Sequence, residues 1–162
     1  MIEGWRHVVA VAGALGSGLM AGFFLAFSTI TMSGLRAVAP AEGLRVMQAI
    51  NRSPNSSPAL LVTLLGTGVV SVAAAAMSVG RLDEASSWYL VSGAALYLVG
   101  TLGLTIVFHV PRNLAIDALD PSAAASLEEW KVHARIWTAG NHVRTVSSLL
   151  AMIAFVLSLR AD

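Results

Sequence analysis

Cysteine is absent from the chain, and charged residues make up only 12% of its 162 residues. The lack of cysteine excludes disulfides, thiolate metal ligands and cysteine nucleophiles. A soluble domain of this length would carry about 25% charged residues. The few charges are also clustered, which leaves long apolar runs between them. The composition therefore predicts a polytopic integral membrane protein with a single transmembrane domain over residues 1–162.

The sequence also lacks the motifs of several common functions. It has no basic patch for nucleic acid, no Gly-x-Ser-x-Gly nucleophile elbow, no phosphate-binding loop and no dinucleotide fingerprint. Its four histidines form no His-x-x-His or Glu-x-x-His pair. Glu129 and His133 are four residues apart, which an exposed helical pair explains. We therefore expect no metal site, no cofactor and no nucleic-acid partner.

The apolar runs predict an all-α, integral membrane four-helix bundle. We expect its transmembrane helices at about residues 8–35, 58–79, 87–109 and 139–159. Short amphipathic helices are expected at about 40–51 and 121–137, in the connections after the first and third helices. Pro111 should end the third helix by forcing Val110 out of helical geometry, and Gly140 should kink the chain before the fourth.

Two further patterns concern assembly and orientation. Gly18 and Gly22 form a GxxxG spacing, which indicates close helix packing inside the bundle or, alternatively, a homo-oligomer. The two long connections carry six basic residues, against three at the ends and in the short loop. The positive-inside rule then places the long connections in the cytoplasm. We expect a multi-pass protein of the bacterial inner (cytoplasmic) membrane, with the lipid bilayer as its main partner.

Polar residues inside the apolar segments gather at one end of the predicted bundle. An arginine inside a membrane helix needs a group that receives it, and Arg144 is such a residue. Topology brings to its side of the membrane the side chains Gln48, Asn51, His109, Asn113, Trp137 and Asn141. His109 could accept a proton near neutral pH, and Arg144 could stabilise a developing oxyanion.

Each of these interpretations has a structural alternative. Arg144 could reach the membrane surface or pair with Asp117, Glu128 or Glu129. His109 could interact with the dipole at a helix C-terminus. The amides Gln48 and Asn51 could cap neighbouring helix ends rather than contact a ligand.

Three short patterns resemble the anthrone oxygenase-like proteins, which are small four-helix membrane proteins. The patterns are Met47-Gln48-x-x-Asn51, Pro111-Arg112-Asn113-x-Ala115, and Trp137-x-x-x-Asn141-x-x-Arg144-Thr145 preceded by Trp130. The resemblance covers nearly the whole chain. It implies oxidation of an anthrone to an anthraquinone by molecular oxygen, with no established cofactor. His109 departs from the pattern, since asparagine is frequent at this position in the family.

The two lines of reasoning lead to one hypothesis and one alternative. The hypothesis is cofactor-independent oxygenation of a lipophilic aromatic at one membrane face, with His109 and Arg144 as catalytic residues. The substrate-binding residues would be Gln48, Asn51, Asn113, Trp137 and Asn141. The alternative is a non-catalytic membrane protein whose polar cluster is structural or binds a lipid or quinone. A cavity beside Arg144 would favour the first hypothesis, and a filled interior would favour the second.

Overall fold

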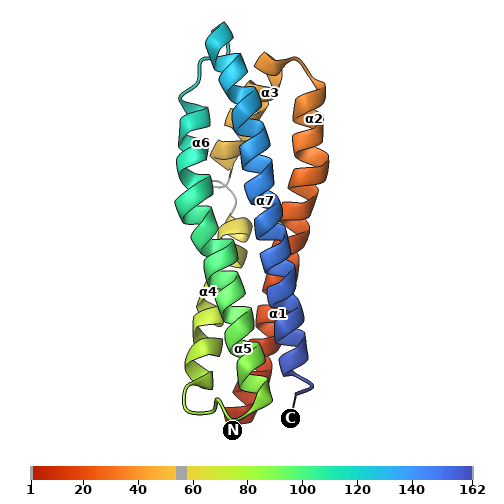
Figure 1. Cartoon of the computed structure of the whole chain (residues 1–162), viewed down its shortest axis with the longest axis vertical. Helices are drawn as coiled ribbons and strands as arrows, with labels where there is room; N and C mark the ends of the chain where they lie inside the picture. The colour runs from red at the N-terminus through yellow and green to blue at the C-terminus, as the bar shows by residue number, and fades with distance from the viewer. Residues whose placement is uncertain (1, 54–57, 162) are drawn as a thin grey trace.

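The computed structural model describes residues 2–53 and 58–161, which form a bundle of helices without strands (Figure 1). Four of these helices are long and apolar enough to cross a membrane, and they cover Gly4–Ala37, Pro58–Ser78, Ala85–Asp117 and Ala124–Ser158. The predicted all-α membrane bundle is thereby confirmed. Both termini lie at the same end of the bundle as the turn between α4 (Pro58–Ser78) and α5 (Ala85–Ala95) (Figure 1).

The first span contains three helical segments without a break. It comprises α1 (Ile2–Ala26), the π-helical turn η1 (Phe27–Thr31) and α2 (Met32–Ala37). The span was expected to begin at residue 8, but it begins earlier. Before residue 8, the guanidinium of Arg6 bonds to Glu84, Ser86 and Ser87 at the start of α5. These contacts make the polar residues before the apolar run part of the bundle.

The amphipathic helix expected at 40–51 is α3 (Pro40–Arg52), with the proline in its first turn. Its buried side chains include Leu44, Met47 and Gln48, and it packs against α2, α6 (Val110–Asp117) and α7 (Ala124–Ser158). The helix thus folds back onto one end of the bundle.

The third span does not end at His109, contrary to expectation. It runs from α5 through the π-helical segments η3 (Leu96–Gly103) and η4 (Thr105–His109) into α6. Val110 keeps helical angles, with φ −58° and ψ −50°. Its N–H donates to the carbonyl of Thr105, five residues back. The hydrogen-bond register of the helix thus shifts from four to five residues just before Pro111. This local adjustment lets the helix continue although the proline has no N–H to donate.

The two elements expected at 121–137 and 139–159 are one helix, the 35-residue α7, without a break at Gly140. The glycine serves close packing instead, because a Cβ there would collide with the ring of Phe108.

Asp120 and Pro121 form a turn before the helix, in which Ser122 donates its backbone N–H to Asp120 Oδ1 at 2.9 Å. The hydrogen bonds from Ser122 lower the pKa of the Asp120 carboxyl below its usual value.

Two apolar clusters form the core on either side of Arg144 along α7. The first includes Phe155 and Tyr97, toward the termini. The second includes Met47, Trp130 and Trp137, where α3 covers the bundle. The polar residues of α7 between these clusters therefore lie inside the protein.

The GxxxG pair divides between two environments. A Cβ at Gly18 would lie 2.9 Å from Met152 Sδ on α7, so this glycine packs inside the chain. A Cβ at Gly22 would meet nothing within 4 Å. Close packing inside the bundle therefore explains Gly18 but not Gly22.

We predict that Gly43, which packs against the turn between α2 and α3, cannot be replaced without loss of stability. A Cβ at Gly43 would lie 2.5 Å from the backbone oxygen of Leu35, which cannot move without displacing the turn. We expect Gly43→Ala to lower the free energy of unfolding by about 1–3 kcal/mol. Gly34→Ala, where a Cβ meets nothing within 4 Å, should be neutral or stabilising. Thermal unfolding in detergent, followed by circular dichroism, would test this, and equal stabilities for the two variants would contradict it.

Candidate functional site

Arg144 is 5% exposed and makes its hydrogen bonds with neutral groups. Its Nη2 donates to Asn141 Oδ1 at 2.5 Å, and its Nη1 donates to Thr105 Oγ1 at 3.2 Å. Its Nε has no hydrogen-bond partner among the described residues. Arg144 forms no ion pair with a carboxylate of residues 2–53 and 58–161, so the expected alternative of a pair with Asp117, Glu128 or Glu129 is wrong there.

Aromatic rings take the place of a counter-ion. The guanidinium carbon of Arg144 lies 4.2 Å from the ring centroid of Phe24 and 5.4 Å from that of Trp137. A cation over an aromatic face is attracted by the ring quadrupole, and the attraction grows when water is excluded. The positive charge of Arg144 is thus stabilised by the faces of two aromatic rings and by the oxygens of Asn141 and Thr105.

Asn141 connects the arginine to the first span. Its Nδ2 donates to the carbonyl of Phe24 at 2.7 Å and to Ser28 Oγ at 2.6 Å, and its Oδ1 accepts from Arg144. The residue is fully buried. Both amide N–H groups are used inside the protein, so Asn141 orients Arg144 and joins α7 to the junction of α1 and η1.

His109 lies beside this cluster and is 1% exposed. Its ring meets Trp137 edge to face, with 4.9 Å between the ring centroids. Neither ring nitrogen has a partner in normal hydrogen-bond geometry among the described residues, although the backbone of Gly140 is close enough to interact with the ring. Because the helix continues past His109, the expected alternative of a histidine at a helix C-terminus is wrong.

Asn113 holds the other side of Trp137. Its Oδ1 accepts from Trp137 Nε1 at 2.7 Å, while its backbone oxygen accepts from Asn51 Nδ2 at 3.3 Å. Asn51 Nδ2 also donates to Asp117 Oδ1 at 3.1 Å. A chain of polar contacts therefore leads from α3 through α6 to the indole beside Arg144.

Gln48 has a capping role in this structure. Its Nε2 donates to the carbonyls of Ile116 and Leu119, at 3.0 and 2.9 Å, where α6 ends. For Gln48, these bonds match the alternative that the amides of α3 cap a neighbouring helix end rather than contact a ligand. Gln48 belongs to the same end of the bundle as Arg144, but its hydrogen bonds go to the end of α6.

The structure thus brings together five of the seven predicted site residues, namely His109, Asn113, Trp137, Asn141 and Arg144. It adds Phe24, Ser28 and Thr105, which the sequence did not single out as site residues. Thr105 shares a helix face with His109, a signal that could have been used. The pairing of Asn141 with Phe24 spans 117 positions and has no local signal.

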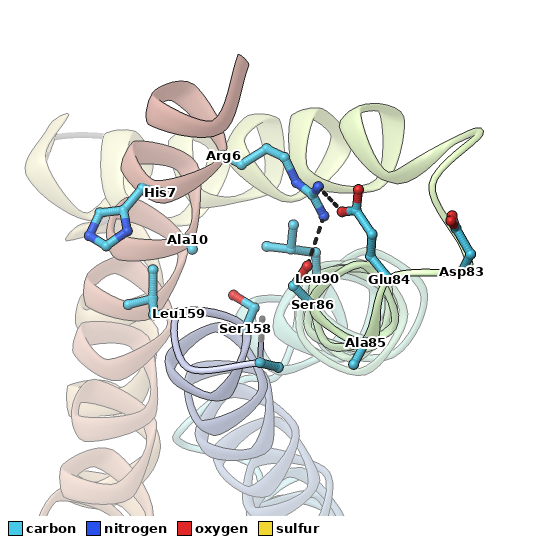
Figure 2. Close-up of a pocket in the computed structure, with 11 residues that line it drawn as sticks. Arg6, His7, Ala10, Asp83, Glu84, Ala85, Ser86, Leu90, Ser158 and Leu159 are labelled. Atoms are coloured by element: carbon cyan, nitrogen blue, oxygen red, sulfur yellow. Dashed lines mark hydrogen bonds and ion pairs between the residues drawn. The ribbon is translucent and has the colours of Figure 1, made fainter. Parts of the chain in front are cut away.

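Neither of the two most prominent cavities in the described part of the chain is lined by a predicted site residue. The larger, of about 720 Å³, lies at the end that carries the termini, where Arg6 meets Glu84 and Ser86 (Figure 2). The smaller, of about 250 Å³, lies between the turn from α2 to α3 and the first half of α7. No group of three metal-binding side chains forms within the described residues either.

A family model now adds independent information. The model described as anthrone oxygenase matches residues 47–154. The chain belongs to the anthrone oxygenase family. The match to this family includes all seven predicted site residues, whereas Phe24 and Ser28 lie outside it. No curated protein and no solved structure matches the chain.

The contacts of Asn141 predict that it stabilises the bundle. Asn141→Ala would remove the hydrogen bonds to the Phe24 carbonyl, to Ser28 Oγ and from Arg144 Nη2. We expect the free energy of unfolding to fall by about 2 kcal/mol or more. Ser28→Ala, which removes one partner, should cost roughly 1 kcal/mol. Unfolding by heat or by denaturing detergent measures both, and the prediction fails if Asn141→Ala is no less stable than Ser28→Ala.

Proposed function

We propose that the chain oxygenates a lipophilic aromatic of the anthrone type, with molecular oxygen as co-substrate, at the cluster around Arg144. One observation carries the proposal: within the described residues, a buried arginine without a carboxylate lies beside a buried histidine whose ring nitrogens make no hydrogen bond of normal geometry, among aromatic rings. A purely structural cation would be expected to use all of its donors. Membership of the anthrone oxygenase family supports the same assignment.

The chemistry needs a base and a stabilised oxyanion. Loss of a proton from the methylene carbon of an anthrone places negative charge on the oxygen of the carbonyl group across the central ring. A ring nitrogen of His109 is the candidate acceptor for that proton. Nε–H of Arg144, which has no partner in the described chain, is the candidate donor to the oxygen. In a site without water both interactions are stronger than in solution.

The overall reaction balances without a further oxidant. The enolate is electron-rich and passes electrons to molecular oxygen. The methylene carbon loses two hydrogens and gains one oxygen atom, while the second oxygen atom leaves as water. This four-electron oxidation of carbon uses the four electrons that one molecule of oxygen accepts. The side chains of the site supply proton transfer and charge stabilisation only.

The remaining residues of the cluster would position these two groups. Asn141 fixes the guanidinium through Oδ1, and Asn113 holds the indole of Trp137 against the histidine. Phe24 and Trp137 provide flat surfaces for an aromatic substrate. Because Arg144 is only 5% exposed, entry of a substrate requires side chains of the cluster to move apart.

A second candidate function is a non-catalytic membrane protein in which the cluster locks the helices together. The observation that favours it is the set of bonds from Asn141 to Phe24, Ser28 and Arg144, which ties α7 to the first span. The position of both prominent cavities away from Arg144 agrees with it. The two functions differ in what the loss of Arg144 should change.

The oxygenase proposal predicts a specific effect of Arg144→Ala. The purified protein should oxidise an anthrone faster than buffer, and the substitution should lower kcat about 10²–10³-fold, as for loss of an oxyanion donor. Arg45→Ala, on the exposed side of α3, should leave the rate unchanged. Absorbance of the quinone product measures the rates. If the unmodified protein is no faster than buffer and Arg144→Ala only destabilises the fold, the structural function is supported instead.

The role of His109 can be separated from its packing. His109→Phe keeps a flat ring against Trp137 and removes both nitrogens, which make no hydrogen bond of normal geometry in the described chain. We expect kcat to fall roughly 10²-fold or more, as for loss of a general base, with little change in the unfolding temperature. Parallel measurement of rate and unfolding tests this. An unchanged rate would show that His109 does not transfer the proton.

A further inference from the structure

The smaller recess has a composition that the Arg144 cluster does not explain. It lies where α2 turns into α3 against the first half of α7, and its volume is about 250 Å³. Apolar side chains and three cations line it, namely Leu35, Val38, Pro40, Trp130 and Ala134 with Arg36, Lys131 and Arg135. No acidic side chain is among the described residues that line it. Such a recess suits a ligand with an anionic group and an apolar body.

We propose that this recess binds the phosphate group of an anionic phospholipid. Its cations are only partly neutralised by the rest of the described chain. Arg135 forms no ion pair there, Arg36 contacts Ser33 Oγ at 3.5 Å, and Lys131 pairs with the exposed Glu128 at 2.6 Å. Two of the three cations thus have no carboxylate partner among the described residues.

The larger recess provides a contrast within the same molecule. Its arginine, Arg6, is bonded to the carboxylate of Glu84 and to two serine hydroxyls, and Asp83 also lines it (Figure 2). The positive charge is therefore balanced by acidic residues at that end of the bundle. Of the two recesses, only the one beside α7 has cations and no acidic residue among the described residues that line it.

The start of α3 adds a second source of positive potential. Pro40 lines the recess in the first turn of this 13-residue helix, and the cap residue Ala39 makes no side-chain hydrogen bond. Pro40 has no N–H, and the N–H groups of Glu42 and Gly43 donate to the carbonyl of Ala39, so the helix dipole and the N–H of Ala41 are what favour an anion at this position. Glu42 lies in the same turn, but it is exposed and does not line the recess.

The depth of the recess matches the headgroup region. A hydrocarbon core of about 30 Å spans roughly 20 helical residues. Counted along α7 from Ser158, this places the core boundary near Thr138, with Arg135 and Lys131 just beyond it. Nearer the core, exposed apolar residues such as Ile30 and Val143 offer surface for acyl chains.

Native mass spectrometry of the full-length, delipidated protein in detergent tests the proposal. Dioleoyl phosphatidylglycerol and dioleoyl phosphatidylcholine are the probes. We expect one phosphatidylglycerol to bind in preference to phosphatidylcholine. In the double variant R36Q/R135Q the affinity for phosphatidylglycerol should fall roughly thirtyfold, because each cation near an anionic headgroup contributes about fivefold. The charge-retaining double variant R36K/R135K should keep most of the affinity.

The matched control is R45Q/R52Q, which removes the same charge from exposed positions on α3 outside the recess. It should bind phosphatidylglycerol as the unmodified protein does. Equal losses in the two glutamine variants would overturn the site, since they would indicate diffuse attraction. Equal binding of the two lipids would overturn it as well. Displacement of the lipid by millimolar inorganic phosphate would overturn the assignment to a lipid, and failure to displace it would support that assignment.

Discussion

The structure depends on how one buried positive charge is accommodated. Arg144 lies inside the bundle, where an arginine without partners would be costly. It is received by a neutral amide, a hydroxyl and an aromatic face, with no carboxylate from the described residues. Neutral partners leave the net positive charge in place. An anion that forms during a reaction would therefore find an uncompensated cation, which is what an oxyanion site requires.

The irregular helical turns lie at the level of this charge. Asn141 bonds to the junction of α1 with the π-helical η1, and Arg144 bonds to Thr105, the first residue of the π-helical η4. Wider turns of this type are often found at functional sites, because they change the direction of side chains within a continuous helix. Here one of them ends at His109, which packs edge to face on Trp137. The same turns also allow the third span to pass Pro111 without a break.

Stability and reactivity have different signatures in this cluster. Asn141 uses all of its hydrogen-bonding groups on the protein itself, which is typical of a residue that holds helices together. The ring nitrogens of His109 and the Nε of Arg144 make no hydrogen bond of normal geometry in the described chain, whereas buried polar groups in a purely structural role are usually bonded. Under the proposed function, the site combines a tightly bonded frame with two groups, the ring of His109 and the Nε of Arg144, that would act on a substrate. Because Arg144 is 5% exposed in this structure, the proposed function requires side chains of the cluster to move before a substrate can enter.

The sequence by itself determined the membrane class, the all-α fold and the family pattern, because apolar runs and polar exceptions are local properties of the chain. It also predicted that Arg144, His109 and Trp137 lie near one another, as their ring and cation contacts show. It misjudged Pro111 and Gly140, since their local tendencies were overridden by a π turn and by close packing on Phe108. Only the tertiary structure decided that the ring of Phe24 lies against the guanidinium of Arg144. That contact joins distant helices, and the free energy of burying a charge depends on all of the groups around it.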